Sequence, residues 1–298
     1  MRGCRATSYR TVCCDGAVSG TDVDPVQLRS VAEQLATEAA AFVRRRRAEV
    51  FGDVAAEPSA VRAKSTPTDP VTIVDTETER LIRERLAVLR PGDHVMGEEE
   101  GGAPAGGADD LTWVLDPIDG TVNFVYDLDT YAVSVAVQRD GVSVAGAVAN
   151  VPSGALYSAA VGAGAHVRRG DVTTVLRTSA AAELSMSLVG TGFSYAREQR
   201  ERQARILAAV LPEVRDVRRM GSCALDLCMV AAGQLDAYYE DGVHLWDWAA
   251  AALIAAEAGA VLRLPPGDGA VGGAGMIVAA APGVAAALDA ALRRAGAL

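Results

Sequence analysis

The chain has 298 residues, of which 50% are hydrophobic and 22% charged, so it resembles an ordinary globular protein with material for a large core. Its 38 acidic residues outnumber its 28 lysines and arginines, and the formal charge of -10 argues against a broad nucleic-acid surface. The five cysteines form no CxxC pair and have no spacing suited to zinc, so we expect reduced thiols and a cytoplasmic protein.

The first twenty residues lack the apolar segment of a signal peptide, and we expect residues 1–23 to form a disordered leader. Two long uncharged stretches, 142–165 and 269–288, contain glycine and proline and break into strand and turn patterns. We therefore expect no membrane span and no membrane partner.

Apolar residues recur at helical spacing from about Asp24 to Phe51. The arginines at 44–47 near the end of this segment are most simply hydrated cations at a helix C-terminus, with contact to a polyanion as the alternative. A second helix is predicted over about 76–89, with Thr76 and Glu79 as a capping box at its start. A short strand at 94–97 should follow, before an acidic and then glycine-rich loop.

The middle of the chain is rich in strand patterns joined by turn signals, which indicates an antiparallel meander. The segments are LTWVLD at 111–116, YAVSVAVQ at 131–138, GVSVAGAVAN at 141–150 and ALYSAAVGAGAHVRR at 155–169. From about Glu183 strands and helices alternate, which predicts a second α/β layer. The predicted strands are 185–193, 214–220 and 236–240, the helices 198–211, 222–233 and 246–259, and one further strand and helix complete the chain.

The sequence WVLDPIDGT at 113–121 places two carboxylates in one sharp turn. Pro117 restricts the backbone, so Asp119 can return beside Asp116, with the Ile118 carbonyl as a third oxygen. Like charges repel at such range unless a cation or a proton intervenes, and Mg²⁺ prefers oxygen ligands of this kind. Asp-Pro turns and aspartate helix caps are also common without a metal.

Other residues near this turn could complete a site. Gly120 permits a close backbone approach, and a helical turn opened by Thr121 would offer N–H groups to an anion. Glu98 belongs to a GEEE run that could equally be solvated, Asp75 precedes the predicted capping box, and Asp247 could simply cap a helix.

Four segments resemble the inositol monophosphatase family in order and approximate spacing, over about residue 25 to the C-terminus. They are DPVTIVD at 69–75, GEE at 97–99, WVLDPIDGTVNF at 113–124 and HLWDWAAAALIAAEAGA at 244–260. The resemblance implies one catalytic domain over 24–298 with the layered α/β/α/β/α sandwich of that family. Residues 24–180 would form an α+β half carrying most metal ligands, and 181–298 an α/β half completing the site.

The same resemblance implies two to three Mg²⁺ ions. Glu98, Asp116 and the Ile118 carbonyl would hold one, and Asp116, Asp119 and Asp247 a second, with a weaker third ion near Glu98. Such ions activate a water for in-line attack on phosphorus and stabilise the leaving oxygen. By the resemblance, no covalent phosphoenzyme forms.

The resemblance also assigns roles to other residues. Asp75 and Thr121 would orient the attacking water, with Glu98 close by, and Lys64 would belong to a mobile loop over the metals. Glu240 would accept hydrogen bonds from polyol hydroxyls, although an exposed loop acid is an alternative. The remaining substrate contacts would be Gly120, Thr121, Gly221, Ser222, Cys223, Ala224 and Asp247.

The resemblance implies a lithium-sensitive homodimeric phosphatase acting on inositol 1-phosphate or a similar polyol phosphate. Fructose 1,6-bisphosphate, histidinol phosphate and a 3',5'-bisphosphate nucleoside are alternative substrates, and a regulatory binding protein without turnover is an alternative function. Gly190-Thr191-Gly192 lacks the third glycine and the acidic residue of a dinucleotide site, so a strand-end turn is favoured.

Overall fold

The computed structural model describes six segments, and every structural statement below refers to them: 24–52, 61–63, 70–104, 106–107, 110–265 and 275–298. The predicted leader and Lys64 lie outside these residues. None of the helices in the described segments is long and apolar enough to cross a membrane.

The first half of the chain forms a seven-stranded sheet in the order β3-β4-β5-β6-β7-β8-β9. The strands are β3 (His94–Gly97), β4 (Leu111–Asp119), β5 (Ala132–Arg139), β6 (Val142–Asn150), β7 (Leu156–Ala160), β8 (Ala165–Arg169) and β9 (Val172–Val175). β3 is parallel to β4, and β4 to β9 form the predicted antiparallel meander. The strand pattern at 155–169 forms two strands, because Gly162 and Gly164 adopt positive φ and turn the chain between β7 and β8, in agreement with the turn expected within 142–165.

Helix α1 (Pro25–Phe51) begins where the Asp24 side chain accepts a hydrogen bond from the Val26 N–H. The prediction that the arginines at 44–47 are simply hydrated is wrong for three of them, whereas Arg45 is exposed. Arg44 donates to the Val151 carbonyl, Arg46 to the Glu77 carboxylate and Arg47 to the Phe124 carbonyl. These contacts tie the end of α1 to three later segments, which the fold brings alongside it.

Helix α2 (Ile73–Leu89) begins three residues earlier than predicted, and its capping box is Thr72 with Asp75 rather than Thr76 with Glu79. The extended backbone of Thr72 lets its side chain accept from the Val74 N–H, while Asp75 accepts from the Thr72 N–H. Glu79 is fully buried and has other partners. A two-stranded ribbon of β1 (Val61–Ala63) and β2 (Pro70–Thr72) precedes α2.

The second half forms a five-stranded sheet in the order β11-β10-β12-β14-β13. Its strands are β10 (Leu188–Thr191), β11 (Asp216–Arg218), β12 (Ala237–Asp241), β13 (Val261–Arg263) and β14 (Met276–Ala280). β10 is parallel to β11 and β12, whereas β14 is antiparallel to β12 and β13. The described residues after α6 therefore form two antiparallel strands where one was predicted.

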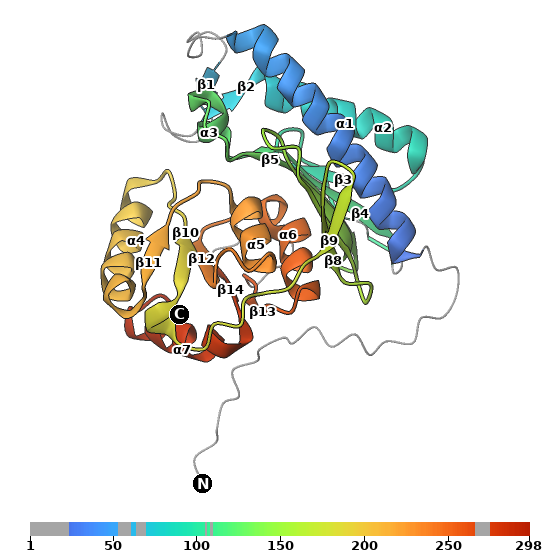
Figure 1. Ribbon diagram of the computed structural model, residues 1–298. Helices are drawn as coiled ribbons and strands as arrows, with labels where there is room; N and C mark the ends of the chain where they lie inside the picture. Colours follow the sequence, from blue (N-terminus) through green and yellow to red (C-terminus); the bar gives the residue numbers. More distant parts are fainter. Residues whose placement is uncertain (1–23, 53–60, 64–69, 105, 108–109, 266–274) are drawn as a thin grey trace.

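The remaining helices confirm the predicted alternation. They are α3 (Thr121–Tyr126), α4 (Arg197–Val210), α5 (Cys223–Ala231), α6 (Leu245–Glu257) and α7 (Pro282–Arg294), with short 3-10 turns η2 (Leu184–Met186) and η3 (Leu211–Glu213). Helices α1 and α2 cover one face of the seven-stranded sheet, and α5 and α6 lie between the two sheets (Figure 1). Helices α4 and α7 cover the outer face of the five-stranded sheet (Figure 1). The predicted five-layer α/β/α/β/α arrangement is confirmed.

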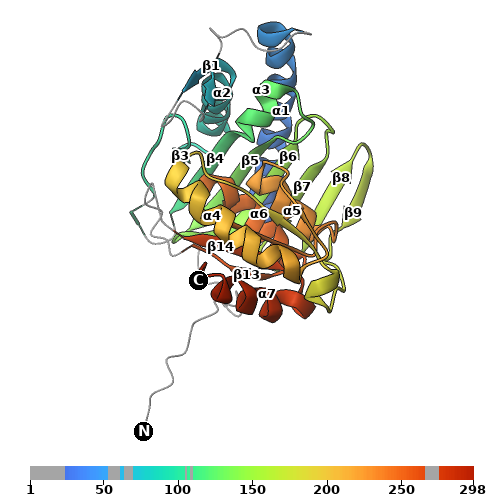
Figure 2. The same ribbon diagram turned by 90° about the vertical axis from the view of Figure 1, so that its left-hand side faces the viewer.

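The layers meet closely because the middle helices carry small side chains. Ala249, Ala250, Ala251 and Ala252 of α6 are all buried. On the facing strand β6, a Cβ placed on Gly146 would lie 3.0 Å from the Cα and Cβ of Ala250. The ribbon β1–β2 and helix α3 lie together at one end of these layers (Figure 2). Residues at this end of the sheets form the candidate site.

Gly146→Val should lower the free energy of unfolding by about 1–3 kcal/mol, because the new side chain must displace α6 from a close-packed interface. Thr173→Val on the exposed strand β9 is the matched control and should change it by less than about 0.5 kcal/mol. Urea unfolding of both variants measures the difference, and equal stabilities would contradict this account of the interface.

Candidate metal centre and active site

The Asp-Pro turn interrupts the end of β4. The pairing of β4 with β5 shifts register between Asp116 and Asp119, and the Ile118 N–H donates to the Asp116 carboxylate over 3.0 Å. Every residue of β4 is buried, including both aspartates. The buried strand thus carries two acids into the interior, where water cannot screen their repulsion.

A third acid reaches the same point from the middle layer. Asp247 lies in the first turn of α6, where its carboxylate accepts a hydrogen bond from the His244 N–H over 2.6 Å. Carboxylate oxygens of Asp116, Asp119 and Asp247 all lie within 4.8 Å of one another. Asp247 therefore caps its helix, as the alternative expectation had it, and also belongs to the acidic cluster.

Glu98 joins the cluster through the parallel pairing of β3 with β4. Gly97 is the register partner of Leu115, and the Glu98 N–H donates to the Leu115 carbonyl over 3.2 Å. The negative charge of Glu98 raises the pKa of Asp116, so the Glu98 carboxyl group lies near that of Asp116.

The electrostatics of this cluster favour a bound cation. Burial raises the pKa of Asp116 well above its usual value, and the charges of Glu98, Asp119 and Asp247 raise it further. Burial likewise raises the pKa of Asp247. Among the described residues, no salt bridge neutralises Asp116, Asp119 or Asp247. Buried oxygen donors without a countercharge fit a hard divalent ion, which would supply the missing positive charge.

Asp119 is held by the start of α5. Its Oδ2 accepts hydrogen bonds from the Ser222 hydroxyl over 2.5 Å and from the Ala224 N–H over 2.7 Å. The Ser222 hydroxyl also accepts from the Leu225 N–H and so caps α5. Burial raises the pKa of Asp119 to about 7, although the two hydrogen bonds oppose this shift. Residues of the second half thereby orient an acid of the first half.

Asp75 and Thr121 lie beside each other at the edge of the cluster. The Thr121 hydroxyl is 3.3 Å from Asp75 Oδ1 and 3.0 Å from the Ile118 carbonyl oxygen, both within hydrogen-bond reach. The other carboxylate oxygen of Asp75 accepts from the N–H and hydroxyl of Thr72. The capping box of α2 therefore fixes the orientation of Asp75 relative to Thr121.

Gly120 makes the turn into α3 possible. Its φ of 94° is in the left-handed region, and a Cβ there would lie 3.0 Å from the Thr130 carbonyl and 3.1 Å from the Gly221 carbonyl. α3 starts at the next residue, as predicted. Asn123 of α3 donates to the carbonyls of Thr130 and Met220, so α3 is fastened to the loop that precedes α5.

Glu79 has a role that its sequence pattern did not predict. Its buried carboxylate accepts the N–H groups of Glu99 and Glu100 over 2.7 Å and 3.0 Å and forms a salt bridge with Arg83. A Cβ on Gly97 would collide with this carboxylate, so the glycine leaves room for it. The sequence signal for this role was the position of Glu79 on the side of α2 that carries Ile82 and Leu86, which the helix buries.

Gly120 and Thr121 lie on the first half of the chain at the start of α3, and the other predicted substrate residues lie on the second half. Gly221 has a φ of 91°, Ser222 caps α5, and Cys223 and Ala224 are buried in its first turn. Glu240 lies on β12 and accepts a hydrogen bond from the Tyr238 hydroxyl. Its charge contributes to the raised pKa values of Asp119 and Asp247, so it belongs to the electrostatic surroundings of the acidic cluster.

Comparisons with known proteins agree with this architecture. The model of the inositol monophosphatase family matches residues 24–297. An inositol-1-monophosphatase of Mycobacterium leprae is 68% identical over 279 residues, which cover 92% of this chain and 96% of that protein. The inositol-1-monophosphatase SuhB of Mycobacterium tuberculosis is 62% identical with the same coverage. The solved structure of Mycobacterium tuberculosis SuhB superposes with a TM-score of 0.80, covering 93% of this chain and 100% of that one.

Stabilisation by Mg²⁺ should increase with pH. The folded, metal-free protein retains a proton on Asp119 up to about pH 7, whereas an unperturbed aspartate releases it near 3.8. The metal-free protein therefore loses stability as pH rises between these values, and a cation that replaces the proton binds more tightly at higher pH. The increase in unfolding temperature caused by Mg²⁺ over a chelator should be larger at about pH 8 than at about pH 5. An increase independent of pH would contradict this assignment.

Glu79→Gln should loosen the acidic loop. The side-chain amide has one acceptor oxygen and no charge, so it cannot accept both the Glu99 and Glu100 N–H groups and also form the salt bridge with Arg83. Amide hydrogen exchange at Glu99 and Glu100 should accelerate by about tenfold or more, corresponding to the loss of about 1–2 kcal/mol. Glu84→Gln, at an exposed position of the same helix, should leave exchange at these two amides unchanged. Equal exchange in both variants would show that Glu79 does not hold the loop.

Proposed function

The chain belongs to the inositol monophosphatase family, and on that premise we propose that it is a phosphoric monoester hydrolase acting on inositol 1-phosphate or a similar polyol phosphate. The convergence of Asp116, Asp119 and Asp247 on one point carries the proposal, because such a cluster suits metal-dependent phosphate chemistry. The Mycobacterium leprae relative, 68% identical, bears the name inositol-1-monophosphatase.

The cofactor we propose is Mg²⁺, as two to three ions. Glu98, Asp116 and the Ile118 carbonyl would hold one ion, Asp116, Asp119 and Asp247 a second, and Glu98 would lie near a third. Bound Mg²⁺ supplies Lewis-acid neutralisation of phosphate charge and lowers the pKa of water. The hydrogen bonds from the Ser222 hydroxyl and the Ala224 N–H to Asp119 keep its second oxygen directed toward the cluster.

The attacking water would be oriented by Asp75 and Thr121. The Thr121 hydroxyl has one proton to donate, and it lies between two acceptors, Asp75 Oδ1 and the Ile118 carbonyl. While it donates to one of them, its lone pairs remain available to accept a hydrogen bond from water. Asp75 is held by Thr72 and can accept a second hydrogen bond from the same water, so the pair can align it for in-line attack.

The phosphate and the polyol would contact different segments. Gly120 and Thr121 start α3 and present N–H groups suited to phosphate oxygens. Glu240 would accept hydrogen bonds from vicinal hydroxyls, with Asp247 on the same side. The start of α5, namely Gly221, Ser222, Cys223 and Ala224, would line the polyol, and Lys64, outside the described residues, would belong to a loop that closes over the metals.

Membership of the family leads us to propose two further properties of the protein. We propose inhibition by lithium, a small cation that would compete for a magnesium position formed by carboxylates. We further propose a homodimer, in which residues 24–298 of each subunit form one catalytic domain. Both properties are accessible to simple measurements, inhibition in the assay below and mass by sedimentation.

Phosphate release should be measured with inositol 1-phosphate, fructose 1,6-bisphosphate, histidinol phosphate and adenosine 3',5'-bisphosphate, with Mg²⁺ and then with added Li⁺. Turnover should be highest with inositol 1-phosphate and should fall when Li⁺ is added. Asp116→Asn should reduce kcat/KM by at least about a thousandfold, because the loss of a shared metal ligand removes several kcal/mol of transition-state stabilisation. Asp171→Asn, at an exposed turn, is the control with full activity.

The alternatives have distinct outcomes in this assay. Preference for another substrate would retain the metal chemistry and replace the polyol assignment. Turnover of none of the four esters in Mg²⁺ would contradict the catalytic proposal, and a biological effect unchanged by Asp116→Asn would favour a regulatory binding protein.

A further inference from the structure

The segment that follows β10 packs directly against Glu240. A Cβ placed on Gly192 would lie within the space of the Glu240 carboxylate, at 1.9 Å from Oε2 and 2.2 Å from Oε1. Gly192 is buried, and its φ lies outside the left-handed region that favours glycine. The backbone conformation therefore does not require glycine at this position. Glycine is required because any side chain would overlap the Glu240 carboxylate.

The hydroxyl of Tyr238 holds the same carboxylate. Tyr238 and Glu240 are two residues apart on β12 and so lie on one face of the strand, and the Tyr238 hydroxyl donates to Glu240 Oε2. The Tyr238 side chain is fully buried in the core between the sheets. A hydrogen bond to an ionised carboxylate in such surroundings is stronger than one between neutral groups. Burial raises the pKa of Glu240, and the bond from Tyr238 opposes this shift.

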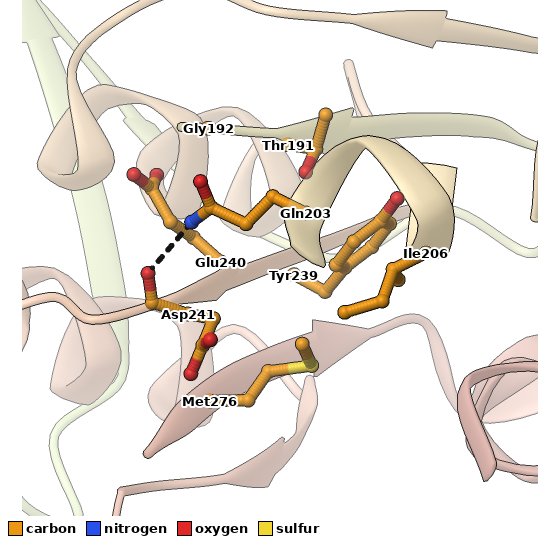
Figure 3. Close-up of a pocket in the computed structure, with 8 residues that line it drawn as sticks. All are labelled: Thr191, Gly192, Gln203, Ile206, Tyr239, Glu240, Asp241 and Met276. Atoms are coloured by element: carbon orange, nitrogen blue, oxygen red, sulfur yellow. Dashed lines mark hydrogen bonds between the residues drawn. The ribbon is translucent and has the colours of Figure 1, made fainter. Parts of the chain in front are cut away.

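Helix α4 fixes the backbone on both sides of this contact. The Gln203 amide donates to the Asp241 carbonyl over 3.0 Å, and its oxygen accepts from the Ser194 N–H over 2.9 Å. Figure 3 shows Gln203 next to Glu240 and hydrogen-bonded to Asp241, with Thr191 at the end of β10 and the following Gly192 nearby. The end of β12 and the segment after β10 are thereby joined, so Gly192 cannot readily move away from Glu240.

We propose that Tyr238 and Gly192 are positioning residues that make the site selective for hydroxyl-bearing phosphate esters by fixing the carboxylate of Glu240. The inference rests on the proposed function, in which Glu240 accepts hydrogen bonds from substrate hydroxyls. Tyr238 occupies one lone pair of the carboxylate and leaves the others for substrate. Gly192 has no side chain and so leaves room for the Glu240 carboxylate in the position where Tyr238 holds it.

The test compares two esters that share the phosphate but differ in hydroxyls, inositol 1-phosphate and p-nitrophenyl phosphate. In Tyr238→Phe and in Gly192→Ala, the ratio of kcat/KM for inositol 1-phosphate to that for p-nitrophenyl phosphate should fall about tenfold, mainly through KM. The first variant removes the hydrogen-bond donor, and the second displaces the carboxylate by steric overlap. Each variant is first checked for folding by its thermal unfolding transition.

Tyr239→Phe is the matched control, because this neighbouring tyrosine is also buried but lies on the opposite face of β12, in the outer core cluster. It should leave the ratio unchanged. In a Glu240→Ala background, Tyr238→Phe should have no further effect on the ratio, since the group that it positions is gone. A purely structural role of Tyr238 would instead lower both kcat/KM values together in either background.

The outcomes separate this inference from the proposed function. An unchanged ratio in Gly192→Ala and in any folded Tyr238→Phe protein, with inositol 1-phosphate still hydrolysed by the wild type, would overturn the inference alone. Equal loss of ratio in Tyr239→Phe would also overturn it. A wild-type protein that hydrolyses neither ester would overturn the proposed function, and the inference with it.

Discussion

The main physical constraint on this structure is the mutual repulsion of several carboxylates that the fold brings to one buried point. Asp116 and Asp119 end a fully buried strand, Asp247 starts a helix of the middle layer, and Glu98 follows the neighbouring strand. Isolated charges so close together in a medium of low dielectric constant raise each other's pKa, and only protons or a cation can relieve the repulsion. The fold holds them together because each is fixed by contacts outside the cluster: the Ser222 hydroxyl and the Ala224 N–H for Asp119, the His244 N–H for Asp247 and the backbone pairing of β3 with β4 for Glu98.

The middle layer connects the two halves of the chain at this point. Small residues let α6 approach the seven-stranded sheet closely, as the contact between Gly146 and Ala250 illustrates. Close approach brings the first turns of α5 and α6 to the end of β4, where side chains and N–H groups at helix starts can meet carboxylates. The close packing of the layers therefore also sets the geometry of the site, because a wider separation of the layers would separate Asp247 from Asp116.

Phosphate chemistry and substrate recognition are supported by different elements. The acids of the cluster depend on β3, β4 and the middle helices, whereas Glu240 belongs to the five-stranded sheet and is held by Tyr238, Gly192 and the α4 contacts of the adjoining backbone. Charged side chains outside the cluster fix other segments of the chain. Glu79 fastens the acidic loop, and Arg44, Arg46 and Arg47 fasten the end of α1 to later segments. Related proteins could thus differ in substrate while the cluster stays the same.

The sequence by itself determined the helix and strand periodicity, the two sheet-forming halves, the turn that pairs Asp116 with Asp119 and, through its motifs, the resemblance to one family. These features are local in the chain, so spacing and turn residues suffice to predict them. Tertiary structure decided the start of α2 at Ile73 and the partners of Glu79 and the α1 arginines. It also decided that Tyr238 and Gly192 meet at Glu240. Such partners lie far apart in the chain, and a polar side chain chooses among them only when packing has removed water and brought one within hydrogen-bond distance.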